Sequence, residues 1–224
     1  MRPSFRTFGP SWPNQRDQAM FIKTRRLAHL LWQATIGRSG FLFHGNDELF
    51  KSLAKDANVY GEYGVGKSTV WIANNTSAKV IAVDTSEKWI NKVTKRTKRR
   101  KNIYIHHSDL GDVGFMGRPK NYSRRDFFFD YTNYLWDQEE KPDLILIDGR
   151  FRVCCFLTSL KFAEEGAKII FDDYVNRPHY HVVERHVART EECGRQALFV
   201  VPPKECIDLQ ELDKDINDFR NVMD

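Results

Sequence analysis

The stretch Gly61-Glu-Tyr-Gly-Val-Gly-Lys-Ser68 (GEYGVGKS) decides the fold, because it carries three glycines in eight positions directly after an apolar run that begins at Asn58. Glycine tolerates backbone conformations that other residues avoid, and it lets the main chain approach a ligand closely. A glycine-rich turn between an apolar run and a helix-like segment is typical of a ligand-binding turn after the first strand of an α/β domain.

Short apolar runs that end in Gly or Asp recur downstream and alternate with helix-like segments. They predict five strands: Asn58 to Glu62, Lys79 to Asp84, Asn102 to His107, Pro142 to Asp148 and Ala167 to Asp173. Continuous apolar strands joined by helices indicate a parallel sheet that is covered on both faces. We therefore expect an α/β fold, a Rossmann-like doubly wound and mostly parallel sheet, with its site at the carboxyl ends of the strands.

The segments outside this rhythm predict the domain organisation. Residues 1–50 are expected to form an N-terminal arm and helices, and residues 51–224 one domain with an insertion at 111–140. A connection as long as the insertion usually has a function. Its aromatic cluster DFFFDYTNYLW packs as an amphipathic helix or forms a wall for a substrate. The basic run at 95–101 (KRTKRRK) is a solvated helix end or a patch for phosphate or nucleic acid.

Composition limits the class of protein. The chain has 224 residues and a net charge of +5, and it has no apolar run of the 18 or more residues that cross a bilayer. Its four cysteines form no CxxC pair and no zinc-ligand spacing, so we expect reduced thiols. These features predict a cytoplasmic protein without a membrane span. The modest positive charge favours anionic partners, and the oligomeric state is open.

The glycine turn fits two patterns. One is the P-loop GxxxxGK[ST], in which backbone N–H groups cradle phosphates and Lys67 would reach the terminal ones. The other is Glu62-x-Gly64-x-Gly66-x-Ser68. The carboxylate of Glu62 is poorly suited to a polyphosphate, because like charges repel. The next predicted strand ends at Asp84, 20 residues after Gly64, which is the spacing of an acidic residue that meets ribose hydroxyls.

The second pattern resembles the first motif of class I S-adenosylmethionine-dependent methyltransferases. The resemblance implies that S-adenosyl-L-methionine is the cofactor. An acidic residue at the position of Glu62 would engage its methionine part, and a polar group at Ser108-Asp109 would lie near its adenine. The residues that the resemblance assigns to the cofactor are Glu62, Gly64, Gly66, Ser68, Asp84 and Asp109.

Three carboxylates follow the last two predicted strands. Asp148 ends one strand, and Asp172 and Asp173 end the next. They should converge at one edge of the sheet, where a hard cation such as Mg²⁺ or Mn²⁺ would relieve their repulsion. The segments LILIDGR and IIFDDY resemble metal-dependent O-methyltransferases of the catechol, caffeoyl-CoA and macrolide-sugar types. Two alternatives remain, which are an acid/base role for Asp148 without metal and simple polar strand ends. Arg150 and Arg152 raise anion recognition as a further one.

The predicted activity is transfer of a methyl group to a hydroxyl, in which Asp148 or His179 receives the proton. We expect a small-molecule or glycan acceptor: a sugar hydroxyl comes first, a small phenolic diol second and nucleic acid third. A P-loop NTPase and a non-catalytic partner subunit are the alternatives from other classes. ATP binding that depends on Lys67 would identify the NTPase, and cofactor binding without turnover would identify the partner subunit.

Overall fold

The computed structural model describes residues 41–43, 46–97 and 100–224. Leu42–Asp224 form one compact unit. Residues 1–40, 44 and 45 of the predicted N-terminal arm and helices lie outside the described residues, and the predicted domain division after residue 50 stays a prediction. No helix in the described part of the chain has the length and apolar character that a membrane span requires.

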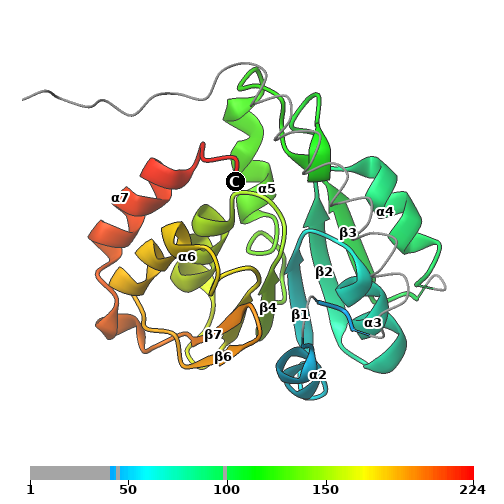
Figure 1. Cartoon of the computed structure of the whole chain (residues 1–224), viewed down its shortest axis with the longest axis horizontal. Coiled ribbons are helices and arrows are strands. Elements are labelled where there is room, and N and C mark those ends of the chain that lie inside the picture. The colour runs from blue at the N-terminus through cyan, green and yellow to red at the C-terminus, as the bar shows by residue number, and fades with distance from the viewer. Residues whose placement is uncertain (1–40, 44–45, 98–99) are drawn as a thin grey trace, which may run out of the picture. The chain divides into compact units, whose positions relative to one another are not determined.

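A seven-stranded sheet in the order β3-β2-β1-β4-β5-β7-β6 forms the centre of the unit (Figure 1). The first five strands of the chain are parallel, β7 pairs antiparallel with β5, and β6 pairs antiparallel with β7. The strands are β1 Val59–Tyr63, β2 Lys79–Asp84, β3 Ile103–His107, β4 Leu144–Ile147, β5 Lys168–Phe171, β6 Glu191–Cys193 and β7 Gln196–Val200. The predicted fold class is confirmed, whereas β6 and β7 were not predicted.

Helices cover both faces of the sheet, as the continuous apolar strands require. In Figure 1, α3 and α4 lie on one face, and α5, α6 and α7 lie on the other. The helices are α2 Glu48–Ala54, α3 Lys67–Asn75, α4 Glu87–Thr94, α5 Phe128–Asn133, α6 Arg152–Phe162 and α7 Leu209–Phe219. Two apolar clusters correspond to the two faces, with Ile72 of α3 in one and Phe156 of α6 in the other. Cys154 and Cys155 lie on α6, and all four cysteines are free thiols, as predicted.

The insertion at 111–140 packs part of its aromatic cluster into the core. Phe128, Tyr131 and Trp136 are buried in the cluster beneath α5 and α6. These three rings are therefore unavailable as a platform for a substrate, whereas Phe127 is 57% exposed and leaves the interpretation as a substrate wall open. The 3-10 turn η1 Phe115–Gly117 folds back onto the end of β2, where the Thr85 hydroxyl donates a 2.6 Å hydrogen bond to the Gly117 carbonyl.

The strand order reverses between β1 and β4, because β2 and β3 extend from one side and β5 from the other. In doubly wound sheets, the carboxyl edge at such a switch point is where ligands bind. The glycine turn follows β1 at this point, and Asp148 follows β4. The topology therefore brings the predicted cofactor and proton-transfer residues to one edge.

Candidate functional site

The glycine turn brings two backbones into close contact. Gly64 has a φ of +90°, and a Cβ added there would lie 2.6 Å from the Cα of Gly149, which follows β4. Gly149 is equally confined, since its own Cβ would lie 2.0 Å from the hydroxyl oxygen of Tyr131. By contrast, a Cβ at Gly66 would meet nothing within 4 Å. The turn is therefore tight on the side of β4 and open at the start of α3.

Glu62 is fully buried at the end of β1 and binds the start of α3. The hydroxyls of Ser68 and Thr69 donate hydrogen bonds to its two carboxylate oxygens. Thr69 Oγ1 in turn accepts a 2.9 Å bond from the Gly66 N–H. Burial raises the pKa of Glu62 to about 7, against the lowering effect of the two hydroxyls. Glu62 thus fixes the shape of the glycine turn from beneath.

Asp84 holds the other side of the same turn. Its Oδ2 accepts a 2.9 Å hydrogen bond from the N–H of Val65, and its Oδ1 accepts a 2.7 Å bond from the N–H of Ser86. Burial raises the pKa of this carboxyl, while these two amides and the positive charge of Arg150 oppose the rise. Asp84 therefore lies at the expected end of β2, beside the glycine turn.

Ser108 and Asp109 follow β3 but lie in different surroundings. Asp109 is exposed and pairs with Arg124 at 2.6 Å. Ser108 is fully buried, and its N–H donates a 3.0 Å bond to the Asp84 carbonyl. The Ser108 hydroxyl has no hydrogen-bond partner in the described part of the chain. Buried hydroxyls normally have one, so the unpaired Oγ is an exception that lies beside Asp84.

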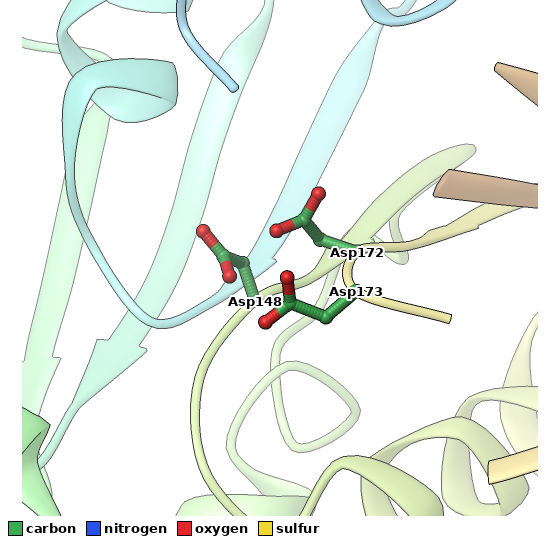
Figure 2. Close-up of side chains that lie close together, drawn as sticks. All are labelled: Asp148, Asp172 and Asp173. Carbon is green, nitrogen blue, oxygen red and sulfur yellow. The ribbon is translucent and has the colours of Figure 1, made fainter. Parts of the chain in front are cut away.

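The three aspartates after β4 and β5 come together as predicted. Figure 2 shows the side chains of Asp148, Asp172 and Asp173 lying close together. One oxygen from each lies within 4.8 Å of the others. Asp172 is fully buried, whereas the side chain of Asp148 is 33% exposed. Burial, together with the negative charge of Asp172, raises the pKa of Asp148.

Three arginines surround this aspartate cluster. Arg195 pairs with Asp172 at 2.6 Å and with Asp173 at 3.0 Å. Arg152 bridges Asp148 and Asp173, at 3.2 Å to each. The remaining contacts are the 2.6 Å pair of Arg177 with Asp173 and the 3.1 Å hydrogen bond from Gln196 to Asp172. Each carboxylate therefore has at least one guanidinium within ion-pair distance.

Two buried residues near the cluster have left-handed backbones. Phe151, just before α6, has a φ of 53°, and Asp173 has a φ of 60°. Non-glycine residues in this region cost about 1 to 3 kcal/mol, and such strain gathers at functional sites. Phe151 lies in the connection between β4 and α6, and Asp173 lies just after β5. The strain therefore supports this edge as the functional region.

His179 lies apart from these contacts. It is exposed in the 3-10 helix η3 Pro178–Arg185, and its ring centroid lies 4.2 Å from that of Tyr180. Tyr180 is buried, and its hydroxyl accepts a 3.2 Å bond from Arg177. His179 thus follows β5 as expected, but no contact described here joins it to Asp148.

The partner of the buried Asp172 is the residue that sequence reasoning missed. Arg195 lies in the hairpin between β6 and β7, which was not predicted. The segment EECGRQALFV does carry a signal, since a Gly-Arg pair separates a polar run from an apolar one. That signal predicts a turn but not which carboxylate the arginine reaches.

Comparisons with known proteins bear on this geometry. No protein-family model and no curated protein matches the sequence. The crystal structure of a methyltransferase-like protein from Silicibacter pomeroyi matches with a TM-score of 0.66 and 29% identity, over 75% of this chain and 92% of that one. The N-methyltransferase NodS from Bradyrhizobium japonicum, in complex with S-adenosyl-L-homocysteine, matches with a TM-score of 0.45 and 13% identity, over 66% and 79%.

The first of these two likenesses carries the argument, because it spans most of both chains at the higher TM-score. It supports the α/β fold described above for this chain. The resemblance predicted from the sequence is thereby confirmed, and the chain has the fold of the class I S-adenosylmethionine-dependent methyltransferases.

Proposed function

We propose that this protein is an S-adenosylmethionine-dependent methyltransferase that acts on a hydroxyl group. The observation that carries the proposal is the glycine turn at the switch point, with Glu62 beneath it and Asp84 beside it. Both carboxylates lie where the resemblance expects cofactor-binding residues. The likeness to the Silicibacter pomeroyi methyltransferase-like protein supports the same assignment.

The residues present fit this cofactor. The open space at Gly66 leaves room beside the start of α3, and the unpaired hydroxyl of Ser108 offers a polar contact near Asp84. The residues that would hold the cofactor are Glu62 through the turn that it shapes, and Gly64, Gly66, Ser68, Asp84 and Asp109 around it. When bound, the cofactor supplies an electrophilic methyl group on a sulfonium. Alignment of the acceptor is then the main task of the protein.

The P-loop alternative fits the structure poorly. Gly61, the first glycine of the P-loop pattern, lies inside strand β1 and is buried there, so the turn itself is shorter than a phosphate cradle. The Ser68 hydroxyl, which would meet Mg²⁺ in an NTPase, donates to Glu62 instead. A buried carboxylate directly beneath the turn would also repel a triphosphate. These three features favour the methyltransferase.

A divalent cation does not fit the aspartate cluster as it stands. Both oxygens of Asp172 and both of Asp173 accept from guanidinium or amide groups, and Oδ1 of Asp148 accepts from Arg152. The guanidiniums already supply the positive charge that a cation would bring. A metal would have to displace Arg152 and Arg195 from their partners. We therefore derive no step through a metal.

Asp148 is the residue that we propose to receive the proton of the acceptor hydroxyl. Its side chain is partly exposed, and the raised pKa makes this carboxylate a stronger base than an ordinary aspartate. Arg152 holds its Oδ1 in place. His179 is the second candidate for this role. For the acceptor we propose a sugar or glycan hydroxyl first and a small phenol second.

The proposal is tested by calorimetric titration with S-adenosyl-L-homocysteine and, separately, with ATP and Mg²⁺. We expect micromolar binding of the first ligand and none of the second, with Lys67→Ala unchanged. Binding of ATP alone would overturn the assignment. A second titration, with MgCl₂ and MnCl₂ on protein treated with EDTA, should give no heat of binding. Saturable metal binding would restore the predicted metal site.

A further inference from the structure

Asp224 binds two groups that follow β4. Its Oδ1 accepts a 2.9 Å hydrogen bond from the N–H of Arg152, the first residue of α6. The guanidinium of Arg150 donates to its main-chain oxygen. Met223, just before it, is buried in the core, which fixes the segment after α7. Figure 1 places this end of the chain near the carboxyl ends of the strands.

The charge of Arg150 lies outside the ion pairs of the aspartate cluster. Those pairs use Arg152, Arg177 and Arg195, and none of them includes Arg150. Burial and the neighbouring charge of Arg152 lower the pKa of Arg150, while the charge of Asp224 raises it. Asp224 is therefore, together with Asp84, an acidic residue whose charge acts on this guanidinium.

Arg150 and Asp224 leave some of their buried polar atoms without hydrogen-bond partners among the described residues. Nε of Arg150 and Oδ2 of Asp224 are both buried, and neither has a hydrogen-bond partner in the described part of the chain. Buried polar atoms without partners cost free energy, and most proteins avoid them. An anion with two or three oxygens can accept from Nε and Nη of a guanidinium together. The guanidinium of Arg150 can therefore form more hydrogen bonds with such an anion than it forms with Asp224.

The residue between the two donors has a strained backbone. Phe151 separates Arg150 from Arg152 and has a left-handed conformation although it is fully buried. Both neighbours nevertheless donate to the same residue, Asp224. Strain of this kind persists where the surrounding structure holds it for a function.

We propose that Arg150 and the first N–H of α6 form a binding site for an anionic group of a ligand, and that Asp224 fills this site when the ligand is absent. The group is a carboxylate or a phosphate. Two molecules can bring it, namely the cofactor through its methionine carboxylate, or an acceptor that carries an acid group. That identification rests on the proposed function. Asp224 competes with the ligand and lowers its apparent affinity.

The anion site is tested with inorganic phosphate as the probe, in calorimetric titrations of the wild-type chain and of Asp224→Ala. We expect Asp224→Ala to bind phosphate about tenfold more tightly than the wild type, because the competing carboxylate is gone. Asp218→Ala is the matched control, since it removes an exposed aspartate of α7 and should match the wild type.

Two further variants keep this test decisive. Asp224→Asn retains an oxygen acceptor for the N–H of Arg152 and removes only the charge, so it serves if the alanine variant does not fold. It should also bind phosphate more tightly than the wild type. The double variant Arg150→Met with Asp224→Asn should not show the higher phosphate affinity of Asp224→Asn. Equal phosphate affinity in the wild type and both Asp224 variants would overturn the proposal, and so would a gain that survives Arg150→Met.

The source of the anion is distinguished with S-adenosyl-L-homocysteine and 5′-methylthioadenosine, which lacks the carboxylate. If the cofactor supplies the group, Arg150→Met weakens the first ligand and leaves the second unchanged. If the acceptor supplies it, both affinities stay unchanged and phosphate still binds to Asp224→Ala saturated with S-adenosyl-L-homocysteine. Equal weakening of both ligands would contradict an anion site at Arg150. Phosphate binding needs no cofactor, so failure of the wild type to bind S-adenosyl-L-homocysteine would refute the proposed function alone.

Discussion

Two groups of carboxylates share one edge of the sheet, yet different kinds of donor compensate their charges. Beside β1 and β2, Glu62 and Asp84 accept hydrogen bonds from hydroxyls and backbone amides, all of them neutral donors. Beside β4 and β5, the aspartate cluster is paired with guanidiniums. At Glu62 the neutral donors satisfy the oxygens but leave the negative charge without a counter-ion, which is why burial raises the pKa of this carboxyl to about 7.

This difference in charge compensation suits the two groups of carboxylates to different roles. A carboxylate without a counter-ion attracts positive charge, which suits the side of the site where a sulfonium cofactor is proposed to bind. A cluster already paired with arginines has little net charge, so it neither needs a metal nor repels an anionic ligand. The predictions below test this division by removing one partner at a time.

Removal of Arg195 should have the largest effect on stability. Arg195→Met leaves the fully buried Asp172 without its guanidinium, and breaking a buried ion pair typically costs about 3 to 5 kcal/mol. We expect a loss of that size in the free energy of unfolding, measured by urea denaturation at pH 7. Arg124→Met is the matched control, because its pair with Asp109 is exposed and should contribute less than about 1 kcal/mol. Equal losses would contradict the distinction between buried and exposed pairs.

Glu62 should make the chain less stable as pH rises. Its pKa in the folded chain is about 7 against 4.5 for the ordinary group, so the folded chain keeps a proton that the unfolded chain releases. The free energy of unfolding therefore falls between these pH values, by about 3 kcal/mol for this group alone. Glu62→Gln should remove this component from unfolding curves measured at pH 4.5 and 8.

The control for Glu62 is Glu140→Gln, an exposed carboxylate that pairs with Lys79. Its pH profile should follow that of the wild type. If the profile of Glu62→Gln also follows the wild type, the carboxyl of Glu62 titrates in the folded chain as it does in water. The two groups of carboxylates would then not differ as proposed.

Loss of the Asp84 carboxylate should lower the affinity for the cofactor more than it lowers the stability of the fold. We expect Asp84→Asn to lower the affinity for S-adenosyl-L-homocysteine about tenfold, or about 1.4 kcal/mol, in a calorimetric titration. Asparagine keeps one oxygen acceptor for the N–H of Val65 or Ser86, so the turn should stay folded. Unchanged affinity, with an unchanged melting temperature, would remove Asp84 from the cofactor site.

The positions of both groups of carboxylates could be predicted, because each of these residues lies at or just after the end of a strand. Continuous apolar runs such as LILI and KIIF predict buried parallel strands, and the residues that follow them meet at one edge. For this reason the convergence of Asp148 with the pair after β5 followed from the sequence. The expectation of a cation there came from the carboxylates and from the resemblance to metal-dependent O-methyltransferases, and neither of these includes Arg195.

The partners were not predictable for a physical reason. Arg195 reaches Asp172 only because the short strand β6 pairs with β7 and places the turn between them over the sheet edge. The strand β6 is the polar segment EEC, which has no apolar alternation to identify it. Arg152 is close to Asp148 in sequence, yet its second pair, with Asp173, depends on the packing of α6. Contacts of this kind are properties of the tertiary structure.

The smallest expected effect concerns Ser108. It can be compared with Ser68, because both serines are buried on the cofactor side and their hydroxyls differ in their hydrogen-bond partners. The Ser68 hydroxyl donates to Glu62, whereas the Ser108 hydroxyl has no partner among the described residues. Ser68→Ala should therefore cost about 1 to 3 kcal/mol in the free energy of unfolding, and Ser108→Ala less than about 0.5 kcal/mol. If Ser108 contacts the cofactor, Ser108→Ala should still lower the affinity for S-adenosyl-L-homocysteine by a few-fold in calorimetry. A large loss of stability in Ser108→Ala would mean that its hydroxyl is bonded within the chain, and the open polar position beside Asp84 would not exist.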